Sequence, residues 1–174
     1  MKNRAKPQLA LKSGFHWRDV TQLAISGNHS RTLFPDFFRA RLGGKPVSHT
    51  ITDNTWLQTD FIKRIQQRRA AIIQARGLSS AKSAAQRVVD TVRSIIEPTP
   101  AEEWHSIALC ADGRYGIEKG FISSFPTRSD GKKLEIVQDL VLKEFSKAKI
   151  ESSVDELKEE RAMVSHLISS NPEN

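Results

Sequence analysis

Two side chains near the start of the sequence are suited to acid–base and carboxylate chemistry. His29 stands in the stretch SGNHS, just after the extended run DVTQLAI. Histidine has an ordinary pKa of about 6.5, so it can take up and release a proton near neutral pH. Arg4 carries a planar guanidinium that can hold a carboxylate through two parallel hydrogen bonds, which lysine cannot do. Spacing alone leaves both roles open, because a solvated turn histidine and a surface arginine are the commoner outcomes.

Several common catalytic and binding patterns do not occur in this sequence. It contains neither G-x-G-x-x-G nor G-x-x-x-x-G-K-[ST], so we find no nucleotide-binding unit in it. The five histidines show no H-E-x-x-H and no paired spacing, and Cys110 is the single cysteine, so we predict no metal site. The nucleophile pattern G-x-S-x-G is also absent.

Charge is unevenly distributed along the 174 residues, whose net charge is +7. Residues 1–87 hold 16 Lys and Arg against four Asp and Glu, whereas residues 88–174 hold 11 against 16. A basic half suits an anionic partner such as nucleic acid, a phosphate-bearing cofactor or a dicarboxylate, or it is simply a solvated surface. No apolar run approaches the ~20 residues that span a bilayer. We expect no membrane partner, no signal peptide and a cytoplasmic location.

The order of the expected elements predicts an α+β fold rather than alternating βαβ units, in one domain over residues 1–174. The expected elements are a helix over 3–13, a strand over 19–25, a hairpin over 41–51, helices over 55–76 and 79–97, strands over 104–110, 120–126 and 133–140, and a helix over 153–169.

Capping and periodicity signals define the limits and faces of these helices. Thr55 with Gln58, and Ser153 with Glu156, are each spaced as a capping box, which predicts helix starts at Thr55 and Ser153. Gly77 is placed to end the first of these two helices. In the helix over 79–97, apolar residues recur at helical spacing and are expected to face the core: Ala81, Ala84, Ala85, Val88, Val92 and Ile95.

Four segments of the sequence follow one another in the order of the motifs of a known family. NRAKPQLALKSG at 3–14 is similar to L-D-x-N-R-A-K-x-Q-x-A, and GNHS with FPDF downstream is similar to G-N-H-S-x-x-x-x-P-D. IQQRRAAIIQARGLSSAKSAA at 65–85 and YGIEKGFISSFP at 115–126 are similar to two further motifs. Through these segments nearly the whole chain resembles the C-terminal half of malate dehydrogenases, in the lactate/malate dehydrogenase family. The resemblance is closest to the group of cytosolic NAD and chloroplast NADP enzymes.

This resemblance implies a reversible oxidation of malate to oxaloacetate with NAD or NADP as cofactor. It implies that His29 is the catalytic acid–base residue and also contacts the cofactor, and that it accepts the hydroxyl proton as hydride leaves for the nicotinamide. It implies that Arg4 binds a substrate carboxylate. Ser79 and Ser80 would line the substrate pocket, cap a helix, or do both. The family also implies a mixed antiparallel sheet with packed helices, and a homodimer in the whole enzyme.

The sequence departs from the family pattern near its start. The family has an aspartate three residues before the arginine, and Met1 occupies that position here. We therefore expect a fragment without the N-terminal NAD-binding Rossmann half, and inactive by itself. Two alternatives remain open. One is an inactive remnant or interaction module derived from the same domain, and the other is a nucleic-acid-binding module that uses basic residues of one helix: Lys63, Arg64, Arg68, Arg69 and Arg76.

Overall fold

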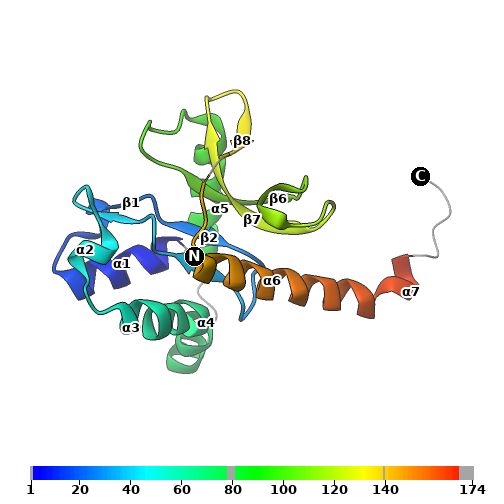
Figure 1. The fold of residues 1–174 in the computed structure, drawn as a ribbon, viewed down its shortest axis with the longest axis horizontal. Coiled ribbons are helices and arrows are strands. Elements are labelled where there is room, and N and C mark those ends of the chain that lie inside the picture. Colours follow the sequence, from blue (N-terminus) through cyan, green and yellow to red (C-terminus); the bar gives the residue numbers. More distant parts are fainter. Residues whose placement is uncertain (1, 78–80, 139, 169–174) are drawn as a thin grey trace.

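Helices and short antiparallel strands make up the computed structural model, which describes residues 2–77, 81–138 and 140–168 (Figure 1). The helices are α1 (Lys2–Ser13), α2 (Val47–Thr50), α3 (Asn54–Trp56), α4 (Ile62–Arg76), α5 (Ala81–Ile96), α6 (Glu144–Met163) and α7 (Ser165–Ile168), with short helical turns η1 (Trp17–Asp19), η2 (Leu57–Phe61) and η3 (Arg114–Gly116). The strands are β1 (Val20–Thr21), β2 (Ala24–Ser26), β3 (Phe34–Asp36), β4 (Arg41–Leu42), β5 (Lys45–Pro46), β6 (His105–Cys110), β7 (Ile122–Ser129) and β8 (Leu134–Ile136). The predicted fold class, α+β with antiparallel pairing and packed helices, is confirmed.

The strands form three small sheets, in the orders β1–β4–β5, β2–β3 and β6–β7–β8, and every pair described is antiparallel. An isolated bridge between Gly27 and Ser124 places the end of β2 against β7. The second sheet therefore continues into the third. β6 and β7 confirm the strands predicted at 104–110 and 120–126, whereas β8 is shorter than the strand predicted at 133–140.

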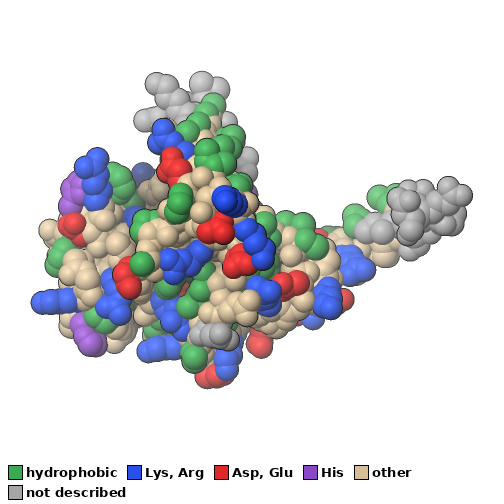
Figure 2. All heavy atoms as spheres, turned by 90° about the horizontal axis from the view of Figure 1, so that it is seen from above, with side chains coloured by type: hydrophobic (Ala, Val, Ile, Leu, Met, Phe, Trp, Pro, Cys, Tyr) green, Lys and Arg blue, Asp and Glu red, His purple; other side chains and the backbone are tan. Residues whose placement is uncertain are grey.

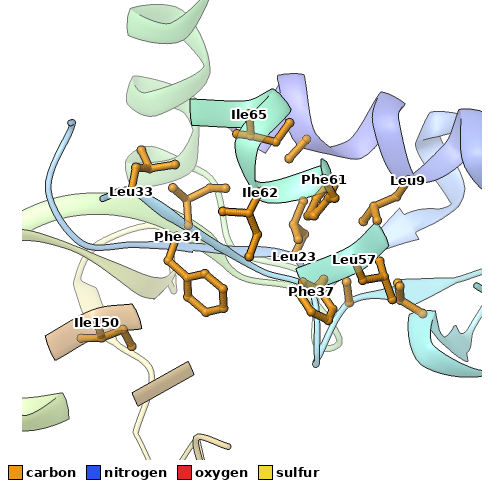
Figure 3. Close-up of a cluster of buried hydrophobic side chains, with 14 of the residues drawn as sticks. Leu9, Leu23, Leu33, Phe34, Phe37, Leu57, Phe61, Ile62, Ile65 and Ile150 are labelled. Carbon is orange, nitrogen blue, oxygen red and sulfur yellow. The ribbon is translucent and has the colours of Figure 1, made fainter. Parts of the chain in front are cut away.

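The hydrophobic core lies where α1, α4 and α6 pack against the short strands. Its largest fully buried side chains include Phe34, Phe37, Phe61 and Phe125. Phe34 on β3 lies between Ile62 of α4 and Ile150 of α6 (Figure 3). This packing fixes α6 beside β3 and, with it, beside the loop that joins β2 to β3.

The helical run from α3 to α4 has a different N-terminal cap from the one predicted. The side chain of Asp53 accepts a hydrogen bond from the amide of Trp56 at 2.9 Å, so Asp53 is the N-cap. The capping box of Thr55 and Gln58 is therefore wrong, because an earlier carboxylate already satisfies the free amide. The run includes a π-helical turn at η2 and ends at Gly77, whose φ of +68° confirms the predicted stop.

Two further predicted limits are wrong. α6 begins at Glu144 instead of Ser153, and Ser153 is fully buried in the interior of that helix. The strand predicted over 19–25 is divided into β1 and β2, because Gln22 adopts a φ of +54°. The amide of Gln22 donates a hydrogen bond to Oε1 of Glu103 at 2.7 Å, and this bond holds the break.

The apolar face of α5 is exposed, although its periodicity predicted that it faces the core. Val88 is 65% exposed, Val92 49% and Ile95 39%. Ala81, Ala84 and Ala85 are exposed as well. α5 lies beside β7, but these residues of its apolar stripe are exposed, so the prediction that the stripe faces the core is wrong.

Surface charge and helix hydropathy bear on the choice of partner. Lys and Arg side chains lie among Asp and Glu on the face seen in Figure 2, so basic charge is dispersed there. Across the described ranges, helices that combine the length and the apolar character needed to cross a bilayer do not occur.

Candidate functional site

His29 lies in a bend just beyond the end of β2, in the loop that leads to β3. Its side chain is exposed, and its backbone amide donates a hydrogen bond to Oδ1 of Asn28 at 2.7 Å. The structure therefore places His29 in a strand-end turn, as its sequence context predicted.

Serine side chains of the β6–β7–β8 sheet hold β2 in place. Ser106 Oγ accepts a hydrogen bond from the Ile25 amide at 2.9 Å, and Ser124 Oγ donates one to the Ile25 carbonyl at 2.7 Å. The Ser124 amide donates to the Gly27 carbonyl at 3.2 Å. These bonds satisfy backbone groups of β2 and fix the strand that precedes His29.

Gly27 allows the chain to pass very close to α6. Its φ is +88°, and a Cβ added there would lie 2.4 Å from Oγ of Ser153 and 2.8 Å from its Cβ. Contacts this short are sterically forbidden, so only glycine fits without movement of α6. The close approach lets the Asn28 amide donate a hydrogen bond to Ser153 Oγ at 2.6 Å.

The carboxylate of Glu156 lies one helical turn beyond Ser153 and accepts hydrogen bonds from the same loop. The donors are Ser30 Oγ, Thr32 Oγ1 and Asn28 Nδ2, the last at 3.4 Å. Burial acts to raise the pKa of Glu156, but these hydrogen bonds outweigh it and hold the pKa below the ordinary value. Glu156 is therefore ionised at neutral pH and fixes the loop on both sides of His29.

Arg4 lies half-buried on the first turns of α1, beside α5. The neighbouring Asn3 donates from Nδ2 to Oδ2 of Asp90 on α5 at 2.9 Å. The pKa of Arg87 on α5 is lowered, mainly by burial. The charge of Asp90 acts to raise this pKa, and the charge of Arg4 lowers it further. Arg4 and Arg87 thus make this end of α1 electropositive.

Glu103, in the loop before β6, also fixes the first turns of α1. Its carboxylate pairs with Lys2 Nζ and Lys6 Nζ, each at 3.3 Å, and also accepts the Gln22 amide. Burial lowers the pKa of Lys2 to about 8, against the opposing attraction of Glu103. One carboxylate therefore links the helix that carries Arg4 to the segment that leads into β2.

A cavity of about 840 Å³ beside α6 is separate from both of these sites. Tyr115, Leu142, Ile150 and Lys158 are among its lining residues, whereas His29 and Arg4 are not.

The structure anchors the predicted residues through two networks. α6 and β7 hold the loop of His29, and α5 and Glu103 hold the helix of Arg4. Ser79 and Ser80 lie outside the described residues, so their predicted roles stay predictions.

Sequence reasoning missed the contribution of Ser153 and Glu156 to this site. It interpreted their spacing as a capping box, but residues three apart also share one face of a continuous helix. The same two residues could therefore have been interpreted as a clamp on a neighbouring segment. Glu103 had no comparable local signal, since its partners are distant in sequence.

Comparisons with known proteins identify what this architecture resembles. A model of the lactate/malate dehydrogenase family, α/β C-terminal domain, matches residues 2–168. Malate dehydrogenase from Naegleria fowleri is 36% identical, with a TM-score of 0.86, over 95% of this chain and 51% of that chain. Lactate dehydrogenase from Trichomonas vaginalis, solved with NADH and oxamate, is 24% identical, with a TM-score of 0.88, over 98% of this chain and 53% of that one. This chain thus spans about half the length of these solved enzymes.

Proposed function

Because the chain belongs to the lactate/malate dehydrogenase family, as its α/β C-terminal domain, we propose that it forms the substrate side of a malate dehydrogenase. The family is one of oxidoreductases. The proposed reaction is the reversible oxidation of malate to oxaloacetate, with NAD or NADP as hydride acceptor. The observation that carries the proposal is an exposed histidine on a loop held by both β7 and α6.

Malate rather than lactate is the proposed substrate on two grounds. Identity is 36% with the malate dehydrogenase of Naegleria fowleri and 24% with the lactate dehydrogenase of Trichomonas vaginalis. The four motifs of the sequence also resemble those of malate dehydrogenases.

His29 is the proposed proton acceptor and donor. As hydride leaves the carbon that bears the hydroxyl, the hydroxyl hydrogen leaves as a proton and the carbon–oxygen bond becomes a carbonyl. The imidazole accepts that proton, and in the reverse direction the imidazolium returns it to the forming hydroxyl. The nicotinamide ring supplies the hydride acceptor when it is bound. An exposed side chain on an anchored loop fits this role, because it can meet a ligand from outside the domain.

Arg4 is the proposed partner of a substrate carboxylate. Its guanidinium can make two parallel hydrogen bonds to the carboxylate, and the nearby charge of Arg87 adds to the attraction of an anion. Ser79 and Ser80 are proposed to line the pocket or to cap α5.

The proposed cofactor is held mainly by a separate dinucleotide-binding domain, with His29 as its contact in this one. A homodimer in the cytoplasm is proposed for the whole enzyme. The exposed apolar residues of α5, among them Val88 and Val92, support an association of this kind. The same face supports the second candidate function, a non-catalytic interaction module.

The test joins this chain to the N-terminal half of the Naegleria fowleri enzyme, because the chain covers 51% of that one. Production of NADH and NADPH is measured with malate and with lactate. We expect His29→Ala to lower kcat about 10²–10⁴-fold and Arg4→Lys to raise KM for malate. The control His49→Ala changes another exposed histidine and should leave both values unchanged. A fully active His29→Ala fusion would refute the proposal.

The isolated chain provides a second test. We expect no malate-dependent NADH or NADPH production from these 174 residues alone, because they span only about half the length of the solved enzymes that they match. Turnover by the purified chain that disappears on His29→Ala would contradict this expectation and would identify a complete active site.

A further inference from the structure

The loop that carries His29 bonds to one carboxylate from both sides of the histidine. Asn28 precedes His29 and donates from Nδ2 to Glu156 Oε2 at 3.4 Å and to Glu160 Oε1 at 3.2 Å. Ser30 and Thr32 follow it, and both hydroxyls donate to the same oxygen. Three donors within five residues of chain therefore meet at one atom of α6.

The backbone of this loop is also fixed locally. Thr32 donates from its amide to Ser30 Oγ at 3.1 Å, and the two hydroxyls are 2.9 Å apart. Thr32 Oγ1 also lies 3.0 Å from Ser153 Oγ, which accepts the Asn28 amide. The loop is therefore bonded within itself and docked on one face of α6.

Hydrogen bonds to an ionised acceptor are roughly twice as strong as neutral ones. Fixing the backbone of a single residue costs about 1–2 kcal/mol of conformational entropy, and residues 28–32 include no buried apolar side chain that could supply it. Polar contacts therefore order this loop, and those with the Glu156 carboxylate join residues on both sides of His29.

We propose that Glu156 is a positioning residue for His29, which fixes the direction of the imidazole by holding Asn28, Ser30 and Thr32. It acts through the loop backbone rather than through contact with a substrate. The consequence for catalysis rests on the proposed function of His29, whereas the positioning itself does not.

Nuclear magnetic resonance of the 174-residue chain tests the proposal without any turnover. The imidazole Cε1–H signals of the five histidines are recorded, and His29→Gln identifies the signal of His29. Backbone amide order parameters are measured over residues 28–32. Glu156→Gln is compared with Glu159→Gln, which makes the same change of charge on an exposed residue of the same helix.

We expect Glu156→Gln to shift the His29 signal and to lower the loop order parameters from about 0.85 to below about 0.6. Glu159→Gln should change neither. Glu156→Asp keeps the charge on a shorter side chain and should give an intermediate result.

Three results would overturn the proposal. One is an unchanged His29 signal and loop in Glu156→Gln, and another is an equal change in Glu159→Gln. The third is loss of the whole folded spectrum in Glu156→Gln alone, which would mean a global role for the residue. None of these depends on whether the fused enzyme oxidises malate, so failure here is distinguishable from failure of the proposed function.

Discussion

Replacing Gly27 with alanine is expected to destabilise the protein for two separate reasons. The backbone there has a φ of +88°, which residues with a Cβ rarely adopt, and the added Cβ would lie 2.4 Å from Ser153 Oγ. Ser153 is fully buried on α6, so it cannot turn away into solvent. The substitution therefore forces either the β2–β3 loop or α6 to move.

The size of the effect follows from these two contributions. Left-handed backbone costs a residue with a Cβ about 1–2 kcal/mol. Overpacking of a well-filled interior costs about 1–3 kcal/mol. Together they give about 2–5 kcal/mol, a large share of the roughly 5–15 kcal/mol that stabilises a typical native protein.

Gly120 offers a matched control for the backbone contribution alone. Its φ is +91°, and a Cβ there would meet nothing within 4 Å. Gly120→Ala should therefore cost about 1–2 kcal/mol, and Gly27→Ala about 1–3 kcal/mol more. Urea unfolding of the purified chain, followed by circular dichroism, gives both free energies by linear extrapolation. Equal losses in the two variants would refute the argument that Gly27 is required by its contact with Ser153.

Three further substitutions probe the ion pairs and the core. Although burial acts to raise it, the charges of Lys2 and Lys6 hold the pKa of Glu103 below 4.5. Its stabilisation is then present above pH 4.5 and lost as pH falls through the folded-state pKa. Glu103→Gln should therefore flatten the fall in unfolding free energy between about pH 7 and about pH 3, and an unchanged slope would contradict this. Burial raises the pKa of Asp36 above 3.8, so its ionisation costs stability as pH rises from 3.8 through the raised value. The free energy of unfolding of Asp36→Asn, minus that of the parent, should therefore be more favourable at about pH 7 than at about pH 3. A difference that does not change with pH would count against this. Phe61 is fully buried in the core, so Phe61→Ala should cost about 3–5 kcal/mol in urea unfolding; a loss below about 1 kcal/mol would exclude a core position.

The sequence by itself determined the features that depend on neighbours along the chain. Gly77 ends its helix because a glycine readily adopts the left-handed conformation of a helix C-terminus. The segments that became β6 and β7 were recognised for a similar local reason, because the turn residues Gly113 and Gly116 lie between them. His29 and Arg4 were found as candidates because their motifs are short and contiguous.

Tertiary structure alone decided what those elements contact. The periodicity of α5 correctly identified an apolar face, but periodicity does not say which surface covers it, and Val88 and Val92 are exposed. Gln22 divides a predicted strand, and its amide donates a hydrogen bond to Glu103, 81 residues further along the chain. A pattern of neighbouring residues cannot show a partner at that distance.

Ser153 and Glu156 show the same division most clearly. Their spacing placed both on one helix face, which the sequence alone could interpret as a cap or as a clamp. The choice depended on Asn28, which is 125 residues from Ser153 along the chain and 2.6 Å from it in space. A local pattern cannot encode that contact, because it exists only once β3 and α6 have packed around Phe34.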